Sequence, residues 1–281
     1  MILRPYQEAG VAAMRAAFTA GARAVCYVAP TGAGKTVEFT HIAQGVQAKG
    51  RRVWITVHRA ELLSQTSIAL RVLGVEHGHI APGSPVTRHP VQVASIQTLA
   101  RRIGRGHLPA PPDLIILDEC HHIASASWGR VVAAYPRARL LGVTATPLRL
   151  DGRGFRPPFD TLILGPTTAE LIEGGWLARP VVYAPPQVAD LSGVRTAMGD
   201  YARDELDSRM DKPTITGDAV AHYKRLCDGR PAIAFCTSVR HAEHVAAAFQ
   251  AAGYRAESID GTMTGAQRTD RIGRLGDGRL H

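Results

Sequence analysis

The segment Ala29–Thr36 holds the residues of this chain best suited to chemistry, because glycines lead into a Lys-Thr pair. An apolar run before it predicts a buried strand, and apolar residues at helical spacing after it predict a helix. Gly32 and Gly34 let backbone N–H groups turn inward around an anion, and the helix that begins near Lys35 adds the positive end of its dipole. We expect Lys35 to contact the β- and γ-phosphates of a nucleotide and Thr36 to ligate Mg²⁺.

The loop departs from the usual phosphate-binding pattern at Ala29, which stands where a first glycine is common. A glycine-rich turn that binds nothing is the alternative, but it would not explain a Lys-Thr pair at the start of a helix. We therefore predict that the chain binds ATP with Mg²⁺. The loop residues expected to contact the nucleotide are Thr31, Gly32, Ala33, Gly34, Lys35 and Thr36.

Two adjacent acids, Asp118 and Glu119, follow an apolar run that predicts a strand buried on both faces of a parallel sheet. Asp118 is suited to hold Mg²⁺, and Glu119 to orient or deprotonate the water that attacks the γ-phosphate. A solvated acidic loop is the alternative, but the position after a buried strand favours the metal site. His121 and His122 do not indicate a zinc site, because no cysteine pair or third spaced ligand accompanies them.

Polar residues elsewhere are also suited to this site. The amide of Gln7 carries a donor and an acceptor that match the edge of adenine, and Arg4 could stack nearby; a surface glutamine is the alternative. Thr144 and Thr146 follow another predicted strand. Their hydroxyls could bond to the acid–histidine cluster and couple nucleotide state to the far side of the cleft, whereas the alternative is a threonine-capped turn.

Alternating strand and helix signals predict the elements that position these residues. The predicted strands are 24–28, 52–57, 91–95, 114–117 and 139–143. The predicted helices run to about residue 19, over 60–73 and over 96–102. Repeated βα units predict a doubly wound α/β domain whose ligands lie at the carboxyl ends of the strands.

The pattern weakens after residue 147 and resumes near residue 218. Helices are predicted at 168–174, 202–210, 218–227 and 238–252, and buried strands at 232–236 and 255–259. We predict three parts: an ATP-binding lobe over residues 1–165, a linker over 166–215, and a partial second α/β lobe over 216–281.

The composition bounds the class of protein. The net charge is +9, which favours an acidic partner, nucleic acid first, although an arginine-rich proteome would give the same balance. The four cysteines are scattered with no CxxC pair, so neither a zinc knuckle nor a disulfide framework is indicated. No signal peptide and no membrane-spanning run is found, so we expect a cytoplasmic protein with no membrane partner.

Together, Leu-Arg-Pro-Tyr-Gln, Ala-Pro-Thr-Gly-Ala-Gly-Lys-Thr, Asp-Glu-Cys-His and Thr-Ala-Thr-Pro resemble the motifs of superfamily 2 helicases. The resemblance is strongest to the DEAD/DEAH-like group related to type III restriction subunits and RadD-type repair proteins. It implies a RecA-like P-loop NTPase lobe followed by an incomplete second RecA-like lobe. It also implies ATP-dependent helicase or translocase activity on nucleic acid, with DNA more expected than RNA.

The resemblance also implies roles for individual residues. Gln7 would read adenine, and the catalytic residues would be Lys35, Asp118, Glu119 and His121. Hydroxyl, amide and arginine side chains are what contacts to the phosphate backbone use, although Arg59 alone would be a routine surface charge. The residues expected to face the nucleic acid are Arg59, Gln65, Ser95, Thr98, Thr237 and Ser238.

The sequence stops before two family motifs, one of which supplies arginine fingers. We expect a truncated form that binds ATP but turns it over weakly, with an unpaired sheet edge that invites a protein partner. One alternative is a non-catalytic, ATP-dependent module that binds nucleic acid or protein. Another is a P-loop ATPase without a nucleic-acid role, against which Thr-Ala-Thr-Pro and Ser-Ile-Gln-Thr-Leu argue.

Overall fold

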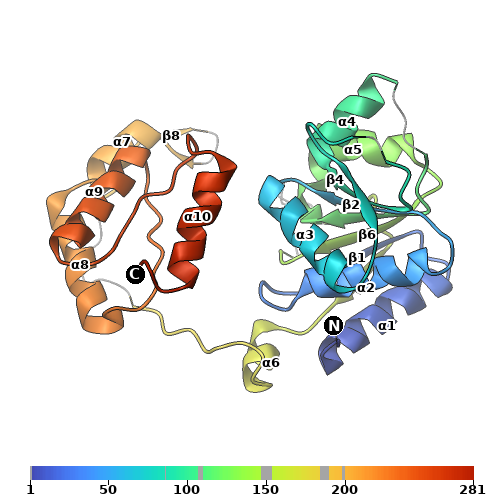
Figure 1. Cartoon of the computed structure of the whole chain (residues 1–281), viewed down its shortest axis with the longest axis horizontal. Coiled ribbons are helices and arrows are strands. Elements are labelled where there is room, and N and C mark those ends of the chain that lie inside the picture. The colour runs from blue at the N-terminus through green and yellow to red at the C-terminus, as the bar shows by residue number, and fades with distance from the viewer. Residues whose placement is uncertain (1, 86, 107–109, 147–153, 184–189, 198–199) are drawn as a thin grey trace. The chain divides into compact units, whose positions relative to one another are not determined.

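The computed structural model describes residues 2–85, 87–106, 110–146, 154–183, 190–197 and 200–281. The chain forms two compact units, Met1–Val181 and Val182–His281, which are described separately (Figure 1). The sequence predicts lobe boundaries at residues 165 and 215, so the first unit extends past the predicted end of the ATP-binding lobe.

A parallel sheet forms the centre of the first unit, with strand order β3-β4-β2-β5-β6-β1-β7. Its strands are β1 (Ala24–Val28), β2 (Val53–Val57), β3 (His77–Ile80), β4 (Val91–Ser95), β5 (Leu114–Asp118), β6 (Arg139–Thr144) and β7 (Thr161–Leu164). Strands β2 and β5 are buried along their whole length, as their continuous apolar runs predict.

Helices cover both faces of this sheet. They are α1 (Pro5–Thr19), α2 (Lys35–Gln47), α3 (Ala60–Val72), α4 (Ile96–Gly104), α5 (Ala126–Ala134) and α6 (Thr168–Glu173), with a 3-10 turn at Cys120–Ala124. Met14, Phe39 and Leu70 of α1–α3 pack in one core, and Leu99 and Trp128 of α4 and α5 pack in another. Neighbouring residues of β1 point into different cores because successive side chains of a strand alternate between faces.

This architecture confirms the predicted α/β fold with RecA-like topology, and the predicted elements up to residue 147 lie within a few residues of their observed bounds. Strands β3 and β7 and helix α5 were not predicted. The sequence of β3, His-Gly-His-Ile, shows no clear apolar pattern, and β7, Thr-Leu-Ile-Leu, is an apolar run of only four residues at the sheet edge, where Leu162 and Leu164 are exposed.

The second unit contains mainly helices among its described residues: α7 (Arg203–Met210), α8 (Pro213–Cys227), α9 (Val239–Ala251) and α10 (Gly265–Gly276). The short strands β8 (Thr196–Ala197) and β9 (Asp200–Tyr201) pair antiparallel. The predicted buried strands at 232–236 and 255–259 were wrong, because both segments lie outside any sheet. A strand needs a hydrogen-bonded neighbour, and without one Phe235 is 95% exposed.

Among the described residues, no helix is long and apolar enough to cross a membrane.

Candidate active site

The loop between β1 and α2 has the backbone shape that an anion-binding loop needs. Gly34 precedes α2 with φ 86°, a left-handed conformation that glycine adopts without strain. A Cβ atom at Gly34 would also collide with the Gln7 side chain. The Lys35 ammonium donates hydrogen bonds to the carbonyl oxygens of Ala29 (2.9 Å) and Pro30 (3.2 Å), which holds it over the loop.

Gln7 ties helix α1 to this loop. Its side chain is 4% exposed; Nε2 donates to the Ala33 carbonyl at 3.0 Å, and Oε1 accepts from the Arg4 backbone N–H at 3.0 Å. The Tyr6 hydroxyl donates to the same Ala33 carbonyl at 2.9 Å. One N–H and one lone pair of the Gln7 amide remain, so adenine reading by Gln7 stays a prediction.

Trp176 and Leu177 also belong to this site, and the sequence did not indicate them. The Arg4 guanidinium lies 5.0 Å from the centre of the Trp176 ring, and Tyr6 meets the same ring edge-to-face at 5.8 Å. Leu177 lies so close to Gly32 that a Cβ there would stand 2.8 Å from it. Trp176 and Leu177, in the turn after α6, are far from the phosphate loop in sequence, so only folding brings the turn and the loop together.

The two acids lie at the same edge of the sheet as the loop. Strand β6 runs between β1 and β5, and its Val143 and Thr144 pair with Asp118 and Val28 respectively. Burial, and then the charge of Glu119, raise the pKa of Asp118 to about 6. Burial lowers the pKa of Lys35, while the charges of Glu119 and Asp118 oppose that shift. Lys35 and the carboxylates of Asp118 and Glu119 therefore interact electrostatically within one site.

The donors at this edge fit Mg²⁺. A buried carboxylate beside a second carboxylate is stabilised by a cation, and Asp118 meets that description. Thr36, half-buried in the first turn of α2, adds a hydroxyl oxygen. No group of three or more histidine, cysteine or acidic residues that could hold a metal occurs in the described part of the chain. Mg²⁺ uses few protein ligands together with phosphate oxygens and water, so one carboxylate and one hydroxyl are enough protein donors for it.

A chain of polar contacts leads from Glu119 to the turn after β6. Glu119 has φ 56°, and no other non-glycine residue in the described ranges has a positive φ. Nδ1 of His121 lies 3.2 Å from the Glu119 carboxylate and 2.9 Å from the Thr144 hydroxyl. The Thr146 backbone N–H donates to the same hydroxyl at 3.1 Å. The structure thus brings Glu119, His121, Thr144 and Thr146 together.

The residues expected to face nucleic acid in the first unit follow β2 and β4. Arg59 and Gln65 are exposed at the start of α3 and within it, and Ser95 and Thr98 are half-exposed around the start of α4. Gln97, a residue whose role the sequence did not suggest, links the two segments. It accepts a hydrogen bond from the Ser95 hydroxyl at 3.0 Å and donates to the His58 carbonyl at 3.2 Å.

In the second unit, Thr237 and Ser238 are already engaged by neighbouring residues. The Thr237 hydroxyl donates to the Asp207 carboxylate at 2.9 Å. The Ser238 hydroxyl accepts from the backbone N–H of His241 at 3.0 Å and so caps helix α9. Their contact with nucleic acid stays a prediction.

Comparison with known proteins assigns the chain to a family. The family model described as "Type III restriction enzyme, res subunit" matches residues 1–149, which is more than half of the chain. The chain therefore belongs to this family, in agreement with the predicted superfamily 2 DEAD/DEAH-like class.

Two curated relatives extend the match. A 51.5 kDa protein of Lactococcus phage (isolate 7-9) is 34% identical over 231 residues, which cover 82% of this chain and 48% of that protein. A Schizosaccharomyces pombe protein, provisionally named mitochondrial ATP-dependent helicase irc3, is 26% identical over 290 residues, covering 96% of this chain and 46% of its own length. The chain thus spans about half the length of these relatives.

A solved structure shares the fold over both units. A variant of Saccharomyces cerevisiae Dbp5, bound to RNA and ADP BeF3, superposes with a TM-score of 0.61 at 14% identity. The match covers 99% of this chain and 72% of that one. At this identity the likeness concerns the fold alone.

Proposed function

We propose that this chain is the motor part of an ATP-dependent helicase or translocase that moves along nucleic acid. The observation that carries the proposal is the shared sheet edge of Lys35 and the acid pair Asp118–Glu119, whose charges act on one another. A relative that is named an ATP-dependent helicase supports the same activity.

Each residue at the site has a part in this proposal. Lys35 exchanges its bonds to the Ala29 and Pro30 carbonyls for the phosphates of ATP. Glu119, held beside His121, accepts the proton of the attacking water. Asp118 and Thr36 would hold Mg²⁺, whose positive charge would offset charge on the transferred phosphoryl group.

We propose that Thr144 and Thr146 couple the ATP site to nucleic acid held by Arg59, Gln65, Ser95 and Thr98. The contact of His121 with Thr144 supports the coupling. Backbone contacts from these residue types are insensitive to sequence, as a translocase requires. DNA is the favoured strand because the family description is that of a restriction enzyme. The cytoplasmic location remains a prediction.

Two substitutions test the assignment. Lys35→Ala should abolish Mg²⁺-dependent ATP binding at the phosphate loop, because the phosphates lose the ammonium group that the loop supplies, and Lys49→Ala is the exposed control. Glu119→Gln should keep binding and lower hydrolysis by about 10²- to 10⁴-fold, the usual contribution of a general base. Calorimetry measures binding, and phosphate release with and without single-stranded DNA or RNA measures turnover. If Glu119→Gln hydrolyses ATP as fast as the parent chain, Glu119 is not the general base.

A second candidate function is a nucleotide-dependent binding module. A groove of about 950 Å³ in the second unit supports it, because the unpaired segments 232–236 and 255–259 line this groove with exposed Ile233 and Phe235. An extended, apolar strand of a partner protein suits such a groove. Binding of ATP and DNA without any hydrolysis by the parent chain would favour this function over the motor.

We also propose that residues 1–281 by themselves hydrolyse ATP slowly. Arginine fingers contribute about 10³- to 10⁵-fold in related phosphoryl transfer, and no segment of this sequence matches that motif. Turnover with single-stranded DNA should therefore stay below about 1 per second, the lower end of typical values. Faster DNA-stimulated phosphate release from the purified 281 residues would contradict the proposal.

A further inference from the structure

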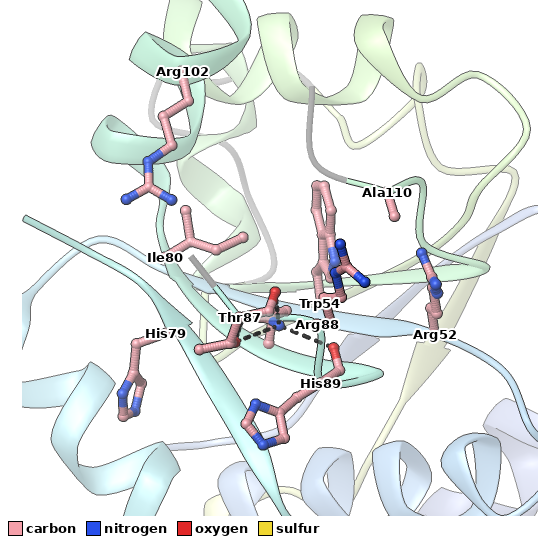
Figure 2. Close-up of a pocket in the computed structure, with 10 residues that line it drawn as sticks. Arg52, Trp54, His79, Ile80, Thr87, Arg88, His89, Arg102 and Ala110 are labelled. Atoms are coloured by element: carbon pink, nitrogen blue, oxygen red, sulfur yellow. Dashed lines mark hydrogen bonds between the residues drawn. The ribbon is translucent and has the colours of Figure 1, made fainter. Parts of the chain in front are cut away.

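A basic hollow lies at the amino edge of the sheet, away from the ATP site (Figure 2). Arg52, directly before β2, and His89, shortly before β4, both line it. The phosphate loop and Asp118 lie at the carboxyl ends of the same parallel sheet. Five-residue strands at about 3.3 Å per residue put the Arg52 and His89 end of the hollow about 16 Å from that edge, and the β3 side of the hollow is separated from β1 by four strands of the sheet. The hollow is therefore a separate site.

The charge around the hollow is one-sided. Three arginines and two histidines line it, and no acidic residue is among the described residues that line it. Arg102 donates a hydrogen bond to the Ser84 carbonyl at 3.4 Å. The neighbouring Asp113 is already engaged by the Arg51 side chain at 2.9 Å and by the Arg52 backbone N–H at 2.8 Å.

Figure 2 shows the arginines on different sides of the space, with Arg88 beside the Trp54 ring and Arg102 near Ile80. Three guanidinium groups around one space make its potential positive, which favours a bound anion. The volume of the hollow, about 400 Å³, is within the range of small-ligand sites.

A buried amide fixes the loop that carries Arg88 and His89. Gln92 of β4 is 5% exposed, and its Nε2 donates to the His89 carbonyl at 2.9 Å and to the Thr87 hydroxyl at 3.0 Å. These bonds are drawn in Figure 2 and hold the backbone on both sides of Arg88 against the sheet. The backbone of Arg88 is therefore held in place, which lowers the entropy cost of binding a ligand.

We propose that this hollow binds the phosphate groups of a phosphomonoester or polyphosphate, separately from the ATP that the phosphate loop takes. Guanidinium groups match phosphate oxygens through paired N–H donors. A phosphomonoester carries a charge of about −1.5 to −2 at neutral pH, which suits three arginines better than a single carboxylate does. The ligand is either a free phosphorylated molecule or the 5′-phosphate of a nucleic-acid strand.

Titration with sodium tripolyphosphate tests the site. The Lys35→Ala background is used because the phosphate loop would otherwise take the same probe. In that background the hollow should bind tripolyphosphate, and Arg88→Gln and Arg52→Gln should each weaken binding about tenfold, the cost of one charge-assisted contact. Arg101→Gln, an exposed arginine of α4 outside the hollow, should leave the affinity unchanged.

Arg52 and Arg88 are exposed, so their replacement leaves the core intact, and the unfolding temperature without ligand checks this. A 5′-phosphorylated oligonucleotide and its 5′-hydroxyl counterpart form the second arm. If Arg88→Gln removes a preference for the phosphorylated strand, the ligand is a strand end; if only tripolyphosphate binding depends on Arg88, it is a free molecule. Equal binding by parent and both arginine variants, or an equal loss in Arg101→Gln, would overturn the proposal.

Discussion

Glu38, in the first turn of α2, is a buried acid close to the phosphate loop. The side chain is 1% exposed, and the Tyr27 hydroxyl donates to one carboxylate oxygen at 2.9 Å. The other oxygen has no hydrogen-bond partner in the described structure. Burial raises the pKa of Glu38 to about 7, against the opposing influence of Tyr27 and Lys35. The acid therefore titrates near neutral pH.

This shift predicts how stability depends on pH. The unfolded chain releases the Glu38 proton near pH 4.5 and the folded chain near pH 7, so the folded state holds more protons in between. The free energy of unfolding should therefore fall as pH rises across that window, by roughly 3 kcal/mol from this group. Glu38→Gln should flatten that part of the profile, as measured by urea unfolding from pH 4.5 to 8.

Tyr27→Phe is the matched variant for this prediction. It removes the hydrogen bond that favours the charged carboxylate, so the fall in stability should extend to higher pH. An unchanged pH profile in Glu38→Gln would show that other groups carry the dependence.

Gly34 offers a second test at the scale of a single residue. Gly34→Ala combines a left-handed backbone with a collision against Gln7, so ATP affinity should fall at least about tenfold. Gly50→Ala has a similar φ, 71°, with open space around it. It should cost about 1–2 kcal/mol of stability and leave ATP binding intact. Equal ATP affinity of the two variants by calorimetry would refute the tight fit.

The segments that follow β2 and β4 are joined by the hydrogen bonds of one side chain, that of Gln97. It accepts a hydrogen bond from the Ser95 hydroxyl and donates one to the carbonyl of His58, the residue before Arg59. Both segments carry residues expected to contact nucleic acid. A side chain that holds them in one arrangement lowers the cost of binding a strand to both.

Gln97→Ala should therefore weaken binding of single-stranded DNA several-fold, by about 1 kcal/mol for the lost hydrogen bonds. ATP affinity should not change, because the nucleotide loop lies in another segment. Gln47→Ala, in α2, is the control. Fluorescence anisotropy with a labelled oligonucleotide measures the effect, and a parent-like affinity would mean that the two segments are positioned independently.

The first unit, Met1–Val181, contains every contact of the ATP site named above. The last of them, Trp176 and Leu177, precede the boundary at Val181. A fragment of residues 1–181 should therefore bind ATP–Mg²⁺ as the full chain does.

A fragment of residues 1–165, which ends at the lobe boundary predicted from sequence, tests whether Trp176 and Leu177 contribute to ATP binding. It lacks the aromatic ring beside Arg4 and the leucine against Gly32, so its ATP affinity should be lower by about tenfold. Leu177→Ala in the full chain separates this contact from fragment instability. Equal affinity of the two fragments by calorimetry would contradict a role for the turn after α6.

Local pattern was sufficient for the loop between β1 and α2, for most strands and helices up to residue 147 and for the position of the acids at the end of β5, but it missed β3, β7 and α5. Apolar periodicity reports burial, and a glycine loop with Lys-Thr has few other uses. The same reasoning failed at 232–236, because apolar residues predict a strand only when a neighbour is present to pair with it.

From sequence alone, the class of fold and the proposed type of chemistry were predictable, because both depend on residues close together in the chain. The tertiary structure alone decided which distant groups meet: Trp176 beside Arg4, His121 against Thr144, and Arg52 with Arg88 around the basic hollow. Such contacts arise from strand order and helix packing, which bring together residues that no spacing in the sequence relates.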